Sequence, residues 1–399
     1  MLTLDQIYQA AYVLKDVARK TDLIHAPEFA EGREIYLKTE NLQLTGSFKL
    51  RGAYYKISQL SDEQKAAGII ACSAGNHAQG VALAATRMGI KSIICMPDGA
   101  PISKIENTKH LGAEVRLAPG TYDDAHDLAV KLQKETGATF IHPFDDDYVI
   151  AGQGTIGLEI LDQLKDVDAV LCPVGGGGLI SGVAYAIKSL NPNVKVYGVQ
   201  AANAPSMFES IHRGKAVTID SVATFADGIA VKTPGETTFE IVSKYVDDIV
   251  TVTEDQIAAA ILRLLERQKL IAEGAGAVSI AAAMFSDLPL EGKKTVCIVS
   301  GGNIDVNILS RVITRGLITS GRNTTLTIAL EDKPGQLVGV SQVISKCGGN
   351  VTAVHHERSD ANMPISSCVL RVGMETKSFE QIEEIRRELK KAGFHIISD

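Results

Sequence analysis

The sequence predicts an α/β protein with mostly parallel sheets, followed by a smaller module of four strands and two helices. Between residues 34 and 299, short apolar runs alternate with helical stretches, and this alternation is typical of a parallel sheet covered on both faces. After a polar segment at residues 320–323, the chain follows a β-α-β-β-α-β pattern, which predicts a ferredoxin-like module with its own core. We therefore expect two domains, at residues 1–320 and 321–399.

Apolar periodicity locates the expected elements along the chain. In the first domain, strands are expected at residues 34–38, 68–72, 92–96, 114–117, 139–141, 169–172, 194–199 and 294–299. Helices are expected at residues 4–15, from residue 49 onward, at 81–88, 103–111, 122–135, 156–164 and 254–270, and in stretches ending near 190 and 284. In the second domain, the strands are 326–330, 351–355, 367–372 and 395–398, and the helices are 336–347 and 379–392. Parallel sheets bind ligands beyond the carboxyl ends of their strands, so the strand-to-helix junctions are the places to look for a site.

Composition narrows the class of protein. Apolar residues make up 45% of the chain and charged residues 22%, as in ordinary globular proteins. The net charge is −7 without a basic tract, so we expect no nucleic-acid partner. The six cysteines are scattered and none forms a CxxC pair, so neither disulfides nor a metal site is predicted. No signal peptide and no run of about 18 apolar residues is present, so we expect a cytoplasmic protein with no membrane partner.

Lys49 lies where a predicted strand leads into an amphipathic helix, in the segment Gly-Ser-Phe-Lys-Leu-Arg-Gly-Ala. Thr45 or Ser47 is expected to cap this helix, which places Lys49 in its first turn. The positive end of a helix disfavours an ammonium group there, and a free lysine amine is what a carbonyl cofactor needs for a Schiff base. For a single lysine, a solvated position on the polar helix face is the commoner situation.

Four consecutive glycines, residues 175–178, follow a buried strand and open a helix. Backbone amides without side chains at the positive end of a helix form a cradle for phosphate. A dinucleotide site is disfavoured, because the glycines at 175–178 and 182 do not fit G-x-G-x-x-G and the next strand ends at Gln200 rather than at an acid. The sequence therefore predicts a monophosphate ligand.

Three further junctions carry polar residues. Ser73-Ala-Gly-Asn-His77 follows a strand and can hold a carboxylate or phenolic oxygen, or can serve only as a turn and helix cap. In that segment His77 is a candidate base, although a packing role is the simpler expectation. Ser300 ends a central strand, and Glu273 faces either the site or a salt bridge. The run 145–147 of three aspartates is expected to be a solvated loop.

Together these motifs resemble those of a known family. The segment around Lys49, Ser-Ala-Gly-Asn-His-Ala-Gln-Gly at residues 73–80, the glycines with Leu179, and Ser300-Gly-Gly-Asn are similar to the serine/threonine dehydratases. That resemblance implies the tryptophan-synthase-β fold type, with two open, mostly parallel α/β subdomains, the smaller (about 50–150) inserted in the larger. It also implies pyridoxal 5'-phosphate (PLP) as the cofactor. The tail resembles an ACT domain, and the threonine-deaminating branch with one such domain is the most similar part of the family.

The resemblance also implies a role for each motif. Lys49 is the expected catalytic residue, which binds PLP covalently and then takes the α-proton of the substrate. PLP contacts are implied for Phe48, for Asn76 at the ring hydroxyl, and for Ser300 at the ring nitrogen. The phosphate is assigned to Gly175, Gly176, Gly177, Gly178 and Leu179. The substrate carboxylate is assigned to Ser73, Ala74, Gly75, Asn76 and His77.

The implied reaction is α,β-elimination of L-threonine to 2-oxobutanoate and ammonia, with L-serine as a second substrate. The preference between them stays open, because one methyl group is worth only about 1–3 kcal/mol. Serine racemase shares the scaffold but carries a serine where this chain has Ala74, so racemisation is expected to be minor. Threonine synthase, a β-replacement synthase and a non-enzymatic amino-acid sensor are further alternatives, which the motif set disfavours. A cation near Asp227 also stays open.

In the tail, the segment Glu331-Asp-Lys-Pro-Gly-Gln-Leu337 stands where the first ACT strand turns into the first helix. The resemblance implies an amino-acid effector, such as isoleucine or valine, with a nucleotide such as AMP as an alternative. The expected effector contacts are Asp332, Gly335, Gln336 and Leu337. A plain oligomerisation module is the simpler interpretation, and a homo-oligomer, dimer or tetramer, is expected in either case.

Overall fold

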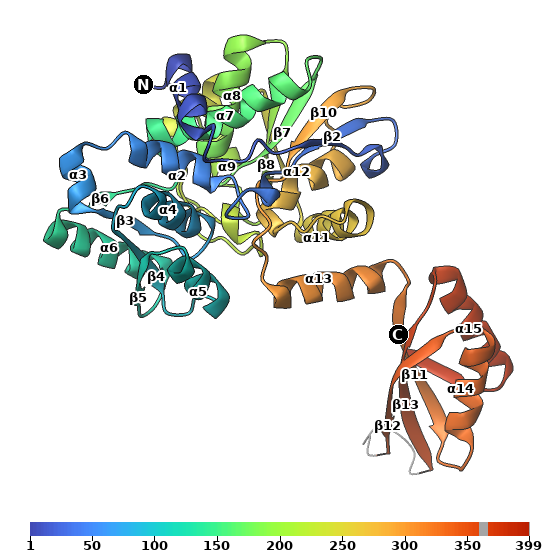
Figure 1. Cartoon of the computed structure of the whole chain (residues 1–399). Helices are drawn as coiled ribbons and strands as arrows, with labels where there is room; N and C mark the ends of the chain where they lie inside the picture. Colours follow the sequence, from blue (N-terminus) through green and yellow to red (C-terminus); the bar gives the residue numbers. More distant parts are fainter. Residues whose placement is uncertain (359–365, 399) are drawn as a thin grey trace. The chain divides into compact units, whose positions relative to one another are not determined.

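The computed structural model describes residues 1–358 and 366–398, which fall into two compact units, Met1–Val306 and Asn307–Asp399 (Figure 1). The second unit begins within helix α13 (Val306–Thr319), whereas the sequence pattern places the domain boundary after that helix, at residue 320. The position of the linker at 320/321 stays a prediction.

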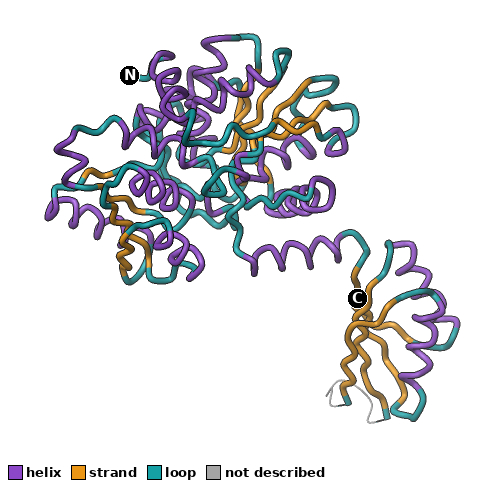
Figure 2. Tube along the Cα trace, viewed as in Figure 1, coloured by secondary structure: helices purple, strands orange, loops and turns teal. Residues whose placement is uncertain are grey.

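A six-stranded sheet forms the larger part of the first unit, in the order β1-β2-β10-β7-β8-β9 (Figures 1 and 2). All neighbouring pairs are parallel except β1 with β2, which is antiparallel at the edge. The strands are β1 (Leu23–His25), β2 (Glu34–Lys38), β7 (Ala169–Pro173), β8 (Lys195–Ala201), β9 (Asp248–Val252) and β10 (Lys294–Ile298).

Helices pack against both faces of this sheet (Figure 1). The helices of this part are α1 (Leu4–Leu14), α7 (Asp147–Gln163), α8 (Gly178–Leu190), α9 (Ser206–Arg213), α10 (Glu236–Tyr245), α11 (Glu254–Arg263) and α12 (Gly274–Phe285). Helices α8, α9 and α12 contact the strands, and α1, α10 and α11 pack on other helices. Short helical turns are η1 (Pro27–Phe29), η2 (Glu40–Leu42), η3 (Asp227–Ile229) and the π-turn η4 (Leu264–Gln268). The core beneath α8 consists of buried aliphatic residues such as Val170, Val183 and Val196, because each strand of a covered parallel sheet is apolar on both faces.

A second, four-stranded parallel sheet has the order β5-β4-β3-β6. Its strands are β3 (Ile69–Cys72), β4 (Ser92–Pro97), β5 (Glu114–Ala118) and β6 (Thr139–Phe140), and its helices are α2 (Lys49–Ser58), α3 (Asp62–Ala67), α4 (Asn76–Arg87), α5 (Ile102–His110) and α6 (Tyr122–Thr136). Alternate residues of β3 enter opposite cores: Ile69 and Ala71 pack in the core that holds α4, and Ile70 and Cys72 in the core that holds α6. These elements run from Lys49 to Phe140, and the bounds of about 50–150 for the smaller subdomain stay a prediction.

The second unit contains a four-stranded antiparallel sheet in the order β12-β13-β11-β14. The strands are β11 (Asn323–Glu331), β12 (Asn350–Glu357), β13 (Ser367–Glu375) and β14 (His395–Ser398), and the helices are α14 (Gln336–Lys346) and α15 (Phe379–Lys391). Leu326, Ile328 and Leu370 pack with Val340 and Ile385 in one core. The β-α-β-β-α-β order predicted from the sequence is confirmed.

The predicted strands all form, and the differences lie elsewhere. β1, β9, α3, α9, α10 and α13 were not expected, and α7 begins at Asp147 rather than near Ile156. The start of α7 is set by Asp146, whose side chain accepts the backbone N–H groups of Tyr148 and Val149. The helix expected over 254–270 ends at Arg263 and continues as η4. In residues 1–358 and 366–398, no helix has the length and apolarity needed to cross a bilayer.

Candidate active site

Lys49 is the first residue of α2, as predicted, but the expected cap is wrong. Phe48 occupies the N-cap position, and no side chain caps the helix. The partly buried Lys49 Nζ donates a hydrogen bond to the backbone oxygen of Pro143 at 2.7 Å. Burial lowers the pKa of this amine from 10.5 to about 8, against a smaller raising effect of Glu273. Lys49 is therefore not a solvated surface lysine, which was the commoner alternative. Its lowered pKa is caused mainly by burial rather than by the helix N-terminus.

A buried ion cluster anchors the helix just behind Lys49. Arg51 is 1% exposed and donates to both oxygens of Glu40 at 2.8 Å and to Glu159 at 2.6 Å. The two carboxylates raise the pKa of Arg51 despite its burial. Removing one partner of a buried ion cluster typically costs about 3–5 kcal/mol, so this contact fixes the first turn of α2. The residues around Arg51 contain no pattern that indicates its burial.

The four glycines form a tight turn between β7 and α8. Gly177 is the N-cap of α8 with φ +98°, a conformation that favours glycine. The first N–H groups of α8, which begin at Gly178 and Leu179, have no acceptor within the helix. Thr238 Oγ1 donates to the oxygen of Gly176 at 2.6 Å and so fixes the turn.

The segment after β6 connects this turn with Lys49. Pro143 accepts the hydrogen bond from Lys49, and the next residue, Phe144, lies directly against the glycines. A Cβ atom added at Gly178 would lie 2.9 Å from Phe144 Cα, and one at Gly176 would meet the Phe144 ring. The structure therefore brings the lysine amine and the glycine turn to the two sides of one short segment.

His142 and Asp145 hold that segment in place. The Nδ1 atom of His142 accepts the backbone N–H of Asp145 at 2.8 Å, and the Asp145 carboxylate accepts that of Thr238 at 3.1 Å. The pKa of His142 is lowered chiefly by burial, which keeps Nδ1 available as an acceptor. Neither residue was assigned a role from the sequence.

The prediction of a solvated loop at residues 145–147 is wrong. All three aspartates are partly buried. Besides the Asp145 contact, Asp146 caps α7 and pairs with Lys56 at 2.6 Å, and Asp147 pairs with the N-terminal amine at 2.7 Å. Acidic runs are usually solvated. The sequence pattern did not reveal the ion-pair partners that would indicate burial of these aspartates.

A chain of polar groups links Asn303, Asn76 and Glu273, and the last of these acts electrostatically on Lys49. Asn303 Nδ2 donates to Asn76 Oδ1 at 2.7 Å, and Asn76 Nδ2 donates to Glu273 Oε1 at 2.5 Å. Glu273 is 3% exposed, and burial raises the pKa of its carboxyl to about 7, with Asp227 adding to the rise. The chain fixes which way the Asn76 amide faces. Asn303 is the last residue of the Ser-Gly-Gly-Asn motif, but it was not predicted to be a site residue.

Ser300 adjoins the lysine through the backbone. Its carbonyl accepts the N–H of Phe48 at 3.1 Å, and its hydroxyl donates to the oxygen of Ala275 at 3.3 Å. The residue is 2% exposed. The tip of β10 and the start of α2 are therefore hydrogen-bonded neighbours.

His77 has a structural contact rather than the environment of a base. Its Nε2 atom donates to the oxygen of Ile141 at 2.9 Å, and burial together with Lys49 lowers its pKa to about 3. The ring is thus neutral and already hydrogen-bonded. The preceding residues Ser73, Ala74 and Gly75 are half-buried, and Ser73 Oγ accepts the N–H of Gly75 at 3.1 Å. Their contact with a substrate carboxylate stays a prediction.

Asp227 and the start of α14 were also singled out from the sequence. Asp227 forms an ion pair with Lys104 at 2.5 Å, and the sequence left open whether a cation binds near it. In the second unit, Gly335 is the N-cap of α14 with φ +94°, and Gln336 and Leu337 form its first turn. Asp332 precedes them and pairs with Arg358 at 3.3 Å. The four predicted effector residues therefore share one strand-to-helix turn, and their role stays a prediction.

The donor set around Lys49 suits a carbonyl cofactor that carries a phosphate. A lysine with a lowered pKa supplies the nucleophile for an aldehyde. The glycine turn offers unpaired helix N–H groups and no side chain that would fill the anion's place. An oriented amide, Asn76, and a neutral hydroxyl, Ser300, complete the set. This combination defines a PLP enzyme.

Comparison with known proteins agrees with that class. Residues 14–301 match the family described as pyridoxal-phosphate dependent enzyme, and the chain belongs to this family. It is 51% identical to the L-threonine ammonia-lyase of Thermotoga maritima over 99% of both chains.

Solved structures of similar fold include two relatives with different names. The processed form of threonine deaminase isoform 2 from Solanum lycopersicum has a TM-score of 0.74 and 43% identity, and the match covers 78% of this chain and 88% of that one. Maize serine racemase has a TM-score of 0.75 and 34% identity, covering 80% and 98%.

The contact between Gly178 and Phe144 generates the first prediction. Gly178→Ala places a methyl group against the Phe144 backbone, so the segment that positions Lys49 must shift. We expect PLP affinity to fall at least about ten-fold, which is about 1.4 kcal/mol, as measured by equilibrium titration of the cofactor-free chain. Gly99→Ala is the matched control, because a Cβ there meets nothing within 4 Å. Equal affinities of the two variants would contradict the geometry.

The lowered pKa of Lys49 generates the second prediction. Only the neutral amine attacks an aldehyde, so the rate at which the cofactor-free chain takes up PLP should rise with pH and reach half its maximum near pH 8, rather than near 10.5. The negative charge of Glu273 raises this pKa, so Glu273→Gln should move the midpoint to lower pH. Stopped-flow absorbance between pH 6 and 10 measures both. An unshifted midpoint in the variant would disprove the coupling.

Proposed function

We propose that the chain catalyses the PLP-dependent α,β-elimination of L-threonine to 2-oxobutanoate and ammonia, and of L-serine to pyruvate and ammonia. The observation that carries this proposal is the lysine amine of lowered pKa beside a glycine turn suited to phosphate. The full-length similarity to an L-threonine ammonia-lyase supports the choice of substrate. Cytoplasmic location and a homo-oligomer remain predictions.

Lys49 performs the proton transfer in this proposal. When PLP is bound, it supplies an electron sink for the negative charge that develops at the substrate Cα. Lys49 Nζ would then accept the α-proton of the substrate as a general base. A pKa near 8 suits that role, because the amine is partly unprotonated near neutral pH and still binds the proton. The α-proton and the β-hydroxyl are lost in sum as one molecule of water, and the released enamine takes up water to give the 2-oxo acid and ammonia.

The other residues bind and orient. The N–H groups at the start of α8, from Gly178 and Leu179, hold the phosphate together with the turn formed by Gly175, Gly176 and Gly177. Phe48 lies beside the amine, with its ring centroid 5.3 Å from Lys49 Nζ. Asn76, held by Asn303 and Glu273, keeps a fixed amide toward the cofactor ring. The N–H groups at the start of α4, which opens with Asn76 and His77, hold the substrate carboxylate.

Ser300 is assigned to the ring nitrogen of the cofactor. A hydroxyl is a neutral partner, so it does not keep that nitrogen protonated as a carboxylate would. The weaker electron sink favours prompt loss of a β-leaving group over reactions that need a long-lived carbanion.

Racemisation is a second candidate, because maize serine racemase shares the fold. At position 74 this chain has a methyl group, which cannot donate a proton to the substrate Cα. We therefore expect little D-serine relative to pyruvate when L-serine is supplied, and equal amounts of the two products would favour the racemase.

Lys49→Arg tests the proposed reaction. The variant keeps the positive charge but has no nucleophilic amine, so release of 2-oxobutanoate from L-threonine should fall at least about a thousand-fold, within the range for loss of a general base. Lys56→Arg is the control, because Lys56 lies on the same helix and pairs with Asp146; it should retain activity within about three-fold. A Lys49→Arg variant with more than a tenth of the activity would refute the assignment.

Regulation through the second unit is the remaining part of the proposal. We expect isoleucine to change the L-threonine kinetics by coupling of about 1–3 kcal/mol, with contacts from Asp332, Gly335, Gln336 and Leu337. The Leu337 side chain is 40% exposed and suits an aliphatic ligand. Its neighbour Val338 is 57% exposed but is not one of the predicted effector contacts. Leu337→Ala should weaken the isoleucine effect at least about five-fold, and Val338→Ala should not. If both variants respond to isoleucine as the unmodified chain does, the effector contacts are misplaced.

A further inference from the structure

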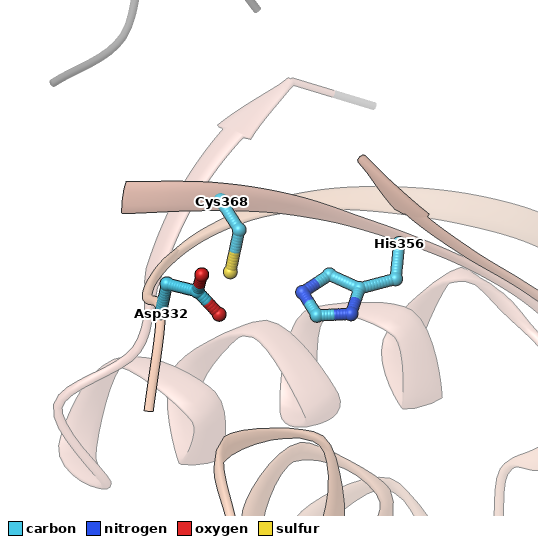
Figure 3. A group of neighbouring side chains, drawn as sticks. All are labelled: Asp332, His356 and Cys368. Carbon is cyan, nitrogen blue, oxygen red and sulfur yellow. The ribbon is translucent and has the colours of Figure 1, made fainter. Parts of the chain in front are cut away.

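Three side chains with different donor atoms meet at one end of the second unit's sheet. The Asp332 carboxylate, the His356 imidazole and the Cys368 sulfur each have an atom within 4.8 Å of the others (Figure 3). Figure 3 shows all three pointing into the same space. Neither the proposed reaction nor the predicted effector accounts for this histidine and cysteine.

The strand register explains why they meet. Cys368 on β13 pairs with Leu330 on β11, and Asp332 lies two residues further along, on the same face. On the other side of β13, His356 of β12 pairs with Leu370, two residues from Cys368, so the two side chains are diagonal neighbours on one face. Strands β12 and β13 and the turn that follows β11 therefore each contribute one donor to a single place.

We propose that Asp332, His356 and Cys368 bind a divalent transition-metal ion, Zn²⁺ being the one that best suits their donors. A thiolate, an imidazole and a carboxylate are all ordinary zinc ligands. Mg²⁺ and Ca²⁺ prefer sites made only of oxygen, and a sulfur donor selects against them. The site differs from the CxxC and HxxxH patterns, which is why residue spacing did not reveal it.

The required movement is small. Ligands at 2.0–2.3 Å from a tetrahedral zinc ion are about 3.3–3.8 Å from each other, so the donors must approach by about 1 Å. Cys368 is 2% exposed and fixes the sulfur, whereas His356 and Asp332 are exposed side chains that can rotate. The ion would therefore gather the two exposed side chains around the buried one.

Arg358 is the group that competes for the carboxylate. Its Nη2 atom lies 3.3 Å from Asp332 Oδ1, and its side chain is 67% exposed. Exposed ion pairs of this kind contribute about 0–1 kcal/mol to stability. This pair engages only Oδ1 of Asp332. A metal ion held by three donors can displace it.

Three protein donors leave a fourth position of a tetrahedral zinc ion for water or a small ligand. Asp332 is also a predicted effector contact, so the two proposals share one residue but have separate tests. Metal binding is measured without amino acid or turnover, and its failure would leave the proposed reaction unaffected.

The test is a titration of the full PLP-loaded chain with Zn²⁺ by calorimetry and with Co²⁺ by absorbance. We expect one ion per chain at this site, and visible cobalt bands of tetrahedral type with thiolate charge transfer. His356→Asn should weaken binding at least about ten-fold. The matched control is His355→Asn, because His355 is the preceding residue of β12 and points to the opposite face of the sheet; its affinity should be unchanged.

A second variant guards against effects on folding. Cys368→Ser should abolish the charge-transfer band, and Cys347→Ser, which changes another cysteine of the same unit, should keep it. The proposal is overturned if the unmodified chain binds no Zn²⁺ or Co²⁺, or if His356→Asn and His355→Asn bind equally.

Discussion

The site depends on close approach of helix backbones at glycines. A Cβ at Gly152 of α7 would lie 2.7 Å from Gly52 Cα of α2, and one at Gly182 of α8 would lie 2.6 Å from the Gly154 nitrogen of α7. Helix α7 therefore contacts α2, which begins at Lys49, and α8, which begins at the glycine turn. Any side chain at these contacts would force the helices apart, and the amine and the anion cradle would separate with them.

Burial then sets the protonation states around the lysine. The same loss of solvent lowers the pKa of Lys49 to about 8 and that of His77 to about 3, and raises that of Glu273 to about 7. Glu273 partly opposes the effect on Lys49, so the amine is tuned by burial and by one carboxylate together. A group with a pKa so close to neutrality serves both as nucleophile and as proton acceptor.

Much of this could be predicted from the sequence, because the motifs lie at strand-to-helix junctions and parallel strands bring such junctions to one edge of the sheet. Lys49 at the start of a helix and the glycine turn were found in this way. The roles of Arg51 and Asp145 could not be found, because their partners Glu159 and Thr238 become neighbours only through tertiary packing. His142 accepts the N–H of Asp145, three residues along the chain, and a histidine that holds a loop in this way has no distinctive sequence pattern. The three donors Asp332, His356 and Cys368 come from the turn after β11 and from strands β12 and β13, and only the register of the sheet shows that they meet.

The central claim is that the Lys49 amine and the glycine turn serve one cofactor. The most direct measurement is borohydride reduction of the PLP-loaded chain, which makes the lysine–cofactor bond permanent, followed by peptide mapping by mass spectrometry. The account predicts one pyridoxyl-phosphate group per chain, on the peptide that contains Lys49. A label on another lysine, or its absence from the reduced chain, would contradict it.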